Sequence, residues 1–186
     1  MIFRPHDEFT LRLAVFLKTA DTPSIPKQEL LQESERLLLK LCELYPTSGT
    51  VNVELADLYY KCEKYASALG YLLRAKLNGY SIESEIVVDY QKRLRNEPLD
   101  LHEDAHGAYL LGGALVESGE QEKGLYFLEQ AVRHGKNQCW QSFAALDLAD
   151  ACRGIDNELM IEALKLASDL GNPEILRAPH KQPSCR

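Results

Sequence analysis

Leu128-Glu-Gln-Ala131-Val-Arg-His-Gly135 is one of three segments in this chain that share the pattern Leu-x-x-Ala-x-x-x-Gly. The other two are Leu72–Gly79 and Leu164–Gly171. In each segment the Leu and the Ala lie one turn apart on the same face of a helix, and the Gly can adopt a positive φ after the last turn. A pattern that recurs in this way predicts a repeat protein, in which each helix pair buries its apolar face against the neighbouring pair.

The rest of the chain has the same helical character. Apolar residues recur at helical spacing from Phe9 to Leu170, and no segment shows the sustained alternation of a β-strand. Proline and glycine residues divide the pattern into successive helices joined by short turns. We therefore expect an all-α solenoid built from antiparallel helix pairs.

The chain divides into three parts in this interpretation. They are an N-terminal helix pair (1–46), the repeats (47–173) and a tail that we expect to be disordered (174–186). Ala131 and Ala167 are 36 residues apart, whereas Ala75 and Ala131 are 56 residues apart. The wider spacing leaves room for an inserted helix at 82–96, where Ile82, Ile86, Tyr90 and Leu94 recur at helical spacing.

Several helix ends are predicted from capping and turn residues. We expect Ser81 to cap the inserted helix and Asp156 to cap the last helix. Asp100 and Glu103 have the spacing of a capping box at the start of another helix. Gly119 is expected to form the turn between two consecutive helices.

The composition excludes several classes of protein. The chain has 186 residues, of which 45% are hydrophobic, so it is long and apolar enough to fold. Its net charge of −7 argues against a nucleic acid or an anionic membrane as the main partner, because both require a cationic surface. The apolar runs are too short to span a bilayer, and we expect no ordinary signal peptide, because no cationic segment followed by an apolar one is found at Met1. We expect a soluble, cytoplasmic protein.

The cysteines support a reducing environment. The chain has an odd number of them and no C-x-x-C pair: Cys42, Cys62, Cys139, Cys152 and Cys185. The first four lie in predicted helices, where we expect small core or boundary side chains.

Two stretches resemble known helical repeats. Leu55-Ala56-x-x-Tyr59, followed by Ala68-x-x-x-Leu72-x-x-Ala75, resembles the tetratricopeptide repeat, although Asn52 stands at the position of the family's tryptophan. Leu111-Gly112-x-x-Leu115, followed by Gly124-x-x-x-Leu128-x-x-Ala131-x-x-x-Gly135, is similar to the Sel-like variant. The resemblance covers about residues 51–172 and implies a right-handed superhelix.

The resemblance also implies a site and a function. In this family the first helix of each pair lines a concave groove that binds a peptide, a helix or a folded protein, without a cofactor. The matching positions here are Val53, Asp57, Tyr60, Lys61, His106, Tyr109, Gly113 and Val116. Some members of the family hold a carboxylate with a clamp of Lys and Asn side chains. The matching positions here are Val53 and Asp57, which do not attract a carboxylate, so a less anionic ligand is expected. The chain would be a non-catalytic adaptor, chaperone or scaffold, and its small acidic build also permits a partner-specific chaperone or a toxin-neutralising protein.

A motif of another class competes with this interpretation. His102-Glu103-x-x-His106 has the H-E-x-x-H spacing at which two histidines can bind zinc while the glutamate activates water, as in a small zinc metallopeptidase. Asp104 places a charge inside the motif, and Tyr109 stands where longer forms of it have glycine. The third ligand would have to come from Glu117, Glu120 or Glu122, which match no known arrangement. We expect no bound metal.

Overall fold

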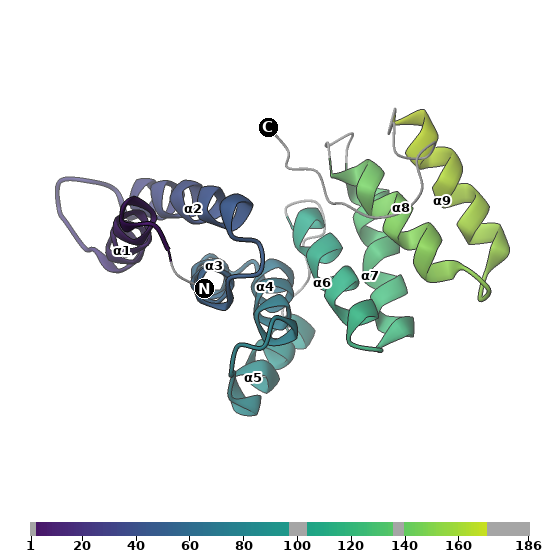
Figure 1. The fold of residues 1–186 in the computed structure, drawn as a ribbon, viewed down its shortest axis with the longest axis horizontal. Coiled ribbons are helices and arrows are strands. Elements are labelled where there is room, and N and C mark those ends of the chain that lie inside the picture. Colours follow the sequence, from purple (N-terminus) through teal and green to yellow (C-terminus); the bar gives the residue numbers. More distant parts are fainter. Residues whose placement is uncertain (1–2, 97–103, 136–139, 171–186) are drawn as a thin grey trace. The chain divides into compact units, whose positions relative to one another are not determined.

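The computed structural model describes residues 3–96, 104–135 and 140–170. Over these residues the chain forms nine α-helices and no strand, which confirms the all-α prediction. The chain divides into two compact units, Met1–Arg93 and Leu94–Arg186, which are described separately (Figure 1).

The first unit holds α1 (Pro5–Thr19), α2 (Lys27–Leu44), α3 (Gly49–Lys61), α4 (Tyr65–Leu77) and most of α5 (Ser84–Asn96). The second holds α6 (Ala105–Glu117), α7 (Gln121–His134), α8 (Gln141–Cys152) and α9 (Asn157–Asp169). Each of these helices is too short or too polar to cross a bilayer.

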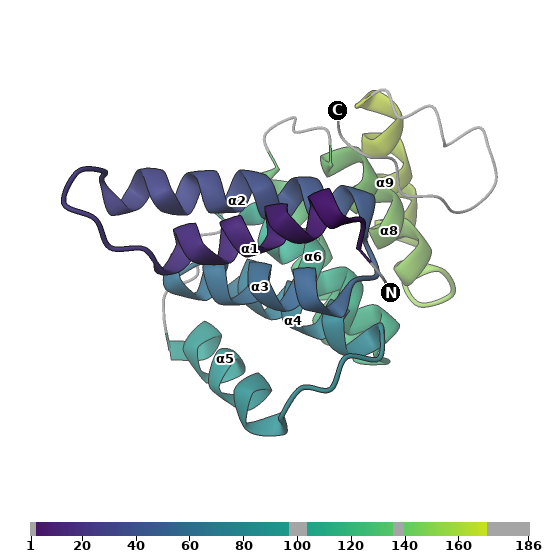
Figure 2. The same cartoon turned by 60° about the vertical axis from the view of Figure 1, so that its left-hand side comes forward.

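Consecutive helices of the first unit pack against one another. The contacting pairs are α1 with α2, α2 with α3 and α3 with α4, and α1 also reaches α3. Figure 2 shows α1 to α4 side by side, with α5 set off from them. Fully buried leucines, among them Leu38, Leu41 and Leu55, fill the space between these helices. Most of these contacts join helices that are consecutive in the sequence. The packing is therefore mainly local along the chain, as expected for stacked helix pairs.

Asn52 holds the turn between α2 and α3. It stands where the resembled repeat has tryptophan, and it is completely buried. Its Nδ2 donates hydrogen bonds to the carbonyl oxygens of Ser48 at 2.8 Å and Pro46 at 3.1 Å. The Ser48 hydroxyl in turn accepts from the backbone N–H of Val51 and caps α3. The turn is therefore fixed by polar contacts rather than by a large aromatic side chain.

Glu63 in the turn between α3 and α4 has a φ of 61°, in the left-handed region that favours glycine. We expect Glu63→Gly to raise the free energy of unfolding by about 0.5–1 kcal/mol, because the strain it removes exceeds the added entropy of the unfolded chain. Chemical denaturation measures the change. Glu63→Ala is the control, since alanine retains the strain, and an equal gain in both variants would contradict this explanation.

Two glycines allow α6 and α7 to approach closely in the second unit. A Cβ added at Gly112 would lie 2.8 Å from the backbone N of Leu128, and one added at Gly124 would lie 2.9 Å from the carbonyl oxygen of Gly112. Such distances are too short for a side chain, so the backbones of the two helices touch at this point. Further contacts join α7 to α8 and α8 to α9.

The glycines predicted to end helices differ in their backbone φ. Gly79 has a φ of 81° and Gly119 a φ of 87°, as predicted for helix-ending turns. The prediction was wrong for Gly135, whose φ is −67°. There the Nε2 of Gln141 donates to the Val132 carbonyl at 2.6 Å, so a side chain satisfies the end of α7. A Cβ at Gly135 would lie 2.6 Å from the Gln141 side chain, so the glycine is needed here for space and not for a positive φ. Gly171 lies outside the described residues.

The predicted caps have different outcomes. Asp156 caps α9 as expected, because its carboxylate accepts from the backbone N–H groups of Glu158 and Leu159. Ser81 does not cap α5: the helix begins at Ser84, and the first turn is closed by a bond from the Ile86 N–H to the Glu83 carbonyl. The predicted capping box at 100–103 lies outside the described residues.

The described cysteines are free thiols. Cys152 is buried and Cys42 is half-buried, but Cys62 is exposed because it is the first residue after α3. The prediction of a core or boundary position was therefore wrong for Cys62. Burial raises the pKa of the Cys42 and Cys152 thiols above the ordinary value, and desolvation by neighbouring atoms raises that of the exposed Cys62 thiol, with Glu35 acting in the same direction. Cys139 and Cys185 lie outside the described residues.

Candidate functional site

The α3 residues of the predicted groove lie along one helix of the first unit. Val53 and Tyr60 are half-buried, whereas Lys61 is exposed. Asp57, one turn before Lys61, is also half-buried. These positions recur every three to four residues, so they form one continuous face of α3.

The charges on this face are paired. Lys18 of α1, whose side chain is only 3% exposed, contacts the Glu54 carboxylate and lies 2.6 Å from the Asp57 carboxylate. Asp57 also pairs with Lys61 at 3.0 Å. Burial alone would raise the pKa of Asp57, but the hydrogen bonds from the two lysines lower it below the ordinary value. Asp57 is therefore an ionised, neutralised carboxylate at neutral pH rather than a free acidic ligand.

The aromatic end of the face contacts α5. The hydroxyl of Tyr60 donates to the Asp89 Oδ2 at 2.7 Å. Its ring stacks on Tyr90, with centroids 4.4 Å apart, and meets the Tyr65 ring edge to face at 5.5 Å. Tyr60 of α3 thus joins α4 and α5 through three side-chain contacts.

Both phenols stay neutral at physiological pH. The hydrogen bond to Asp89 raises the pKa of Tyr60, and Arg93 beside the same hydroxyl acts in the opposite direction. Burial raises the pKa of Tyr90, and the nearby Asp57 carboxylate acts in the same direction. Tyr60 therefore remains a hydrogen-bond donor over the whole physiological range.

The contact between α5 and the Tyr60 end of this face was not predicted from the sequence. Helical spacing predicted the helix itself. It also placed Ile86 on the same apolar face as Tyr90, whereas Ile86 is exposed in the structure. The buried side chains of α5 are Val87 and Tyr90, which lie one turn apart. The adjacent Asp89 and Tyr90 could have indicated a contact with another tyrosine, because an acid can accept its hydroxyl hydrogen bond and an aromatic ring can stack on it. The sequence did not show, however, that this tyrosine is Tyr60.

The α6 residues of the predicted groove belong to the second unit. Tyr109 is only 8% exposed and stacks on Trp140, with an interplanar angle of 11°. The His106 ring lies 5.4 Å from the Trp140 ring. Val116 packs toward α7, where its Cγ2 would lie 2.5 Å from a Cβ at Gly124. Tyr109 and Val116 therefore contribute to the packing of this unit.

The zinc motif lies only partly within the described residues. His102 and Glu103 fall outside them, and His106 makes the ring contacts just described. Of the suggested third ligands, Glu120 is paired with Lys123. Over the described part of the chain, no three His, Cys, Asp or Glu side chains are placed to hold a metal ion together.

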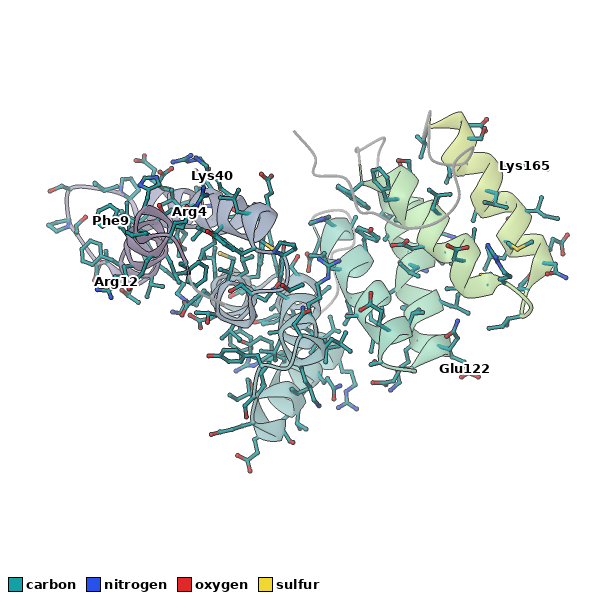
Figure 3. All side chains as sticks on the ribbon, in the orientation of Figure 1. Arg4, Phe9, Arg12, Lys40, Glu122 and Lys165 are labelled. Carbon is teal, nitrogen blue, oxygen red and sulfur yellow. The ribbon has the colours of Figure 1, made fainter. Side chains whose placement is uncertain are left out.

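A second surface, on α1, was not predicted. Phe9 is 65% exposed and Phe16 is 62% exposed, and Leu13 lies between them on the same face. Figure 3 shows Phe9 and Arg12 projecting away from α2 and α3. The first helix of the chain therefore presents an apolar stripe to solvent.

Polar contacts on the inner face of α1 fix this orientation. The buried Asp7 carboxylate accepts from the Tyr45 hydroxyl at 2.6 Å and from Arg4 at 2.7 Å. The buried Ser34 hydroxyl of α2 donates to the Ala14 carbonyl at 2.8 Å, and Lys18 pairs with α3 as described. Asp7, Ala14 and Lys18 lie seven and four residues apart, a spacing that marks one helix face and could have predicted a polar inner side.

The sequence was also compared with known proteins. No protein-family model matches the chain, and no curated protein matches it either. The resemblance to tetratricopeptide and Sel-like repeats therefore remains a prediction from the residue pattern.

Proposed function

We propose that this chain is a non-catalytic protein-interaction module, a right-handed solenoid of the tetratricopeptide or Sel-like kind that binds a helix of a partner protein through α3. In this role it acts in the cytoplasm as an adaptor, chaperone or scaffold. It needs no cofactor, because binding depends on shape, aromatic contacts and a few hydrogen bonds.

One observation carries this proposal. The face of α3 that the repeat pattern assigns to a partner already contacts a helix, the chain's own α5, through Tyr60. A stacked ring and a tyrosine hydroxyl bonded to a carboxylate are contacts that protein interfaces commonly use. The charge on the face supports the same view, since Asp57 is neutralised by Lys18 and Lys61 and does not repel an acidic side chain.

We expect Tyr60→Ala to weaken partner binding at least about tenfold, because it removes the ring and the hydroxyl that contact a bound helix. Tyr126→Ala is the matched control, since Tyr126 is 52% exposed on α7. Partners are captured from a native extract with both variants, identified by mass spectrometry and then titrated as purified proteins. Unchanged affinity of the purified partner for Tyr60→Ala would remove α3 as the binding face. Tyr109 is left intact because its burial makes its loss a packing defect.

The non-catalytic proposal is tested by metal analysis. Protein purified without a histidine tag is expected to contain much less than one zinc ion per chain, because a third ligand would have to come from Glu117, Glu120 or Glu122, which match no known arrangement. Elemental analysis by mass spectrometry measures the ratio. A ratio near one, lost in His106→Ala, would favour the zinc peptidase instead.

A further inference from the structure

We propose that α5 is a displaceable helix that contacts the partner-binding face of α3 at Tyr60, and that an amphipathic partner helix with the same contact residues takes its place. This inference rests on the proposed function and adds both the chemistry of the partner and a means of regulation. The Tyr60 end of the α3 face would be occupied by α5 in the free protein and by the partner helix in the complex.

Few of the described side chains of α5 are buried. Among its described side chains only Val87 and Tyr90 are buried, at 8% and 9% exposure. The α4 helix, which also has 13 residues, buries nine of its residues. A helix of this length is only marginally stable in water by itself, so α5 depends on these contacts for its structure and position.

The hydrogen bond between Tyr60 and Asp89 is also easily exchanged. This bond is exposed to solvent, so water can replace either partner when α5 leaves. The stack of Tyr60 on Tyr90 is lost in the same step. Regions with few buried apolar contacts and solvent-exposed hydrogen bonds open at lower free energy than the rest of a fold.

The residues of α5 define what the face recognises. Val87 and Tyr90 lie one turn apart and face the unit, and Asp89 directly precedes the aromatic residue. The partner is therefore a helix with an apolar residue, an aromatic residue three positions later and an acid directly before the aromatic. Tyr60 would bind that acid, and the rings of Tyr60 and Tyr65 would contact the aromatic side chain.

Because α5 is tethered to the face, it competes at a high effective concentration. A short flexible connection gives an effective concentration on the order of 1 mM. A free helix with the same contacts therefore binds the intact protein more weakly than it binds a protein in which α5 is released.

The experiment uses the full chain and a labelled peptide of residues 81–96. In the released variant, Val87→Asp with Tyr90→Ala, the two buried side chains of α5 are lost while α3 and α4 are unchanged. Fluorescence anisotropy, with the binding protein titrated to about 1 mM, is expected to show at least tenfold tighter peptide binding to the released variant than to the wild type. Ile86→Ala with Val88→Ala is the matched control, since both positions are exposed on α5, and it should behave as the wild type.

Two outcomes would overturn the proposal: equal peptide binding to wild type and released variant, or no binding to either. Adding Tyr60→Ala to the released variant should abolish the binding, and undiminished binding would place the peptide elsewhere and contradict the proposal. Hydrogen exchange on the wild type gives an answer that does not depend on any variant: amides of α5 should exchange at least tenfold faster than those of α4, and equal protection would exclude displacement. If the peptide fails but the captured partner still requires Tyr60, the proposed function stands and only the displacement of α5 is rejected.

Discussion

Asn52→Asp is expected to lower the free energy of unfolding by about 3–5 kcal/mol at pH 7, because it buries a charge with no compensating partner. The Asn52 amide is fully buried and donates to the carbonyls of Pro46 and Ser48. A carboxylate at this position cannot donate, and it faces two carbonyl oxygens. Urea denaturation followed by circular dichroism measures the loss.

The loss in Asn52→Asp should depend on pH. Burial raises the pKa of the introduced carboxyl above the value of about 3.9 that it has in the unfolded chain. The penalty is therefore complete above the raised pKa and fades as the pH falls toward about 4, where the protonated group can donate one hydrogen bond. Asn52→Ala is the control, since it removes the donor without adding a charge and its loss should not vary with pH.

Each variant must be compared with the wild type at the same pH. The bond from the Tyr45 hydroxyl lowers the pKa of Asp7, and the bonds from Lys18 and Lys61 lower that of Asp57. Groups with a lowered pKa stabilise the fold above their unfolded pKa, and that contribution is lost as the pH falls through the folded value. The wild type therefore also loses stability in acid. A pH-independent difference between Asn52→Asp and wild type would contradict the buried-charge explanation.

Gly112→Ala and Gly113→Ala are expected to have opposite effects, although the two residues are neighbours in α6. At Gly112 the new Cβ would lie 2.8 Å from both the Cγ and the backbone N of Leu128, so α6 and α7 must separate, at a cost of about 2–3 kcal/mol. At Gly113 no atom lies within 4 Å of the new Cβ. That change should stabilise the protein by about 0.5–1 kcal/mol, because alanine favours the helix and restricts the unfolded chain.

Thermal and chemical unfolding of the two glycine variants measure this difference. The same substitution at adjacent positions changes helix propensity equally, so the difference between the variants reports only the contact with α7. Equal shifts in both variants would show that α6 and α7 do not depend on a close backbone approach at Gly112.

Local sequence signals predicted the helices and many of their ends. Helical spacing predicted the all-α fold, and Gly79, Gly119 and Asp156 were correctly identified as helix-terminating or capping residues. These features depend on interactions within one or two turns of the residue concerned, so a single sequence contains the necessary information. Gly135 was misassigned because the end of α7 is closed by Gln141, a residue of the next helix.

Long-range polar contacts were not predictable in the same way. The rotation of α1 is set by Asp7 and Lys18, whose partners are Tyr45, directly after α2, and Asp57 in α3. Hydrophobic spacing alone favours burial of Phe9 and Phe16, and the structure exposes both. The position of α5 depends likewise on the pairing of Tyr60 with Asp89, 29 residues away in the sequence. Patterns of apolar residues identify helices, but they do not specify which polar side chains meet between them.

The exposed aromatic stripe on α1 has a practical consequence for handling the protein. Dyes that fluoresce on contact with apolar surfaces report unfolding because folded proteins usually offer them little to bind. Phe9, Leu13 and Phe16 offer such a surface in the native state. A melting curve recorded with such a dye would start from a bright baseline, and a weak rise in signal on heating would understate how cooperatively the chain unfolds.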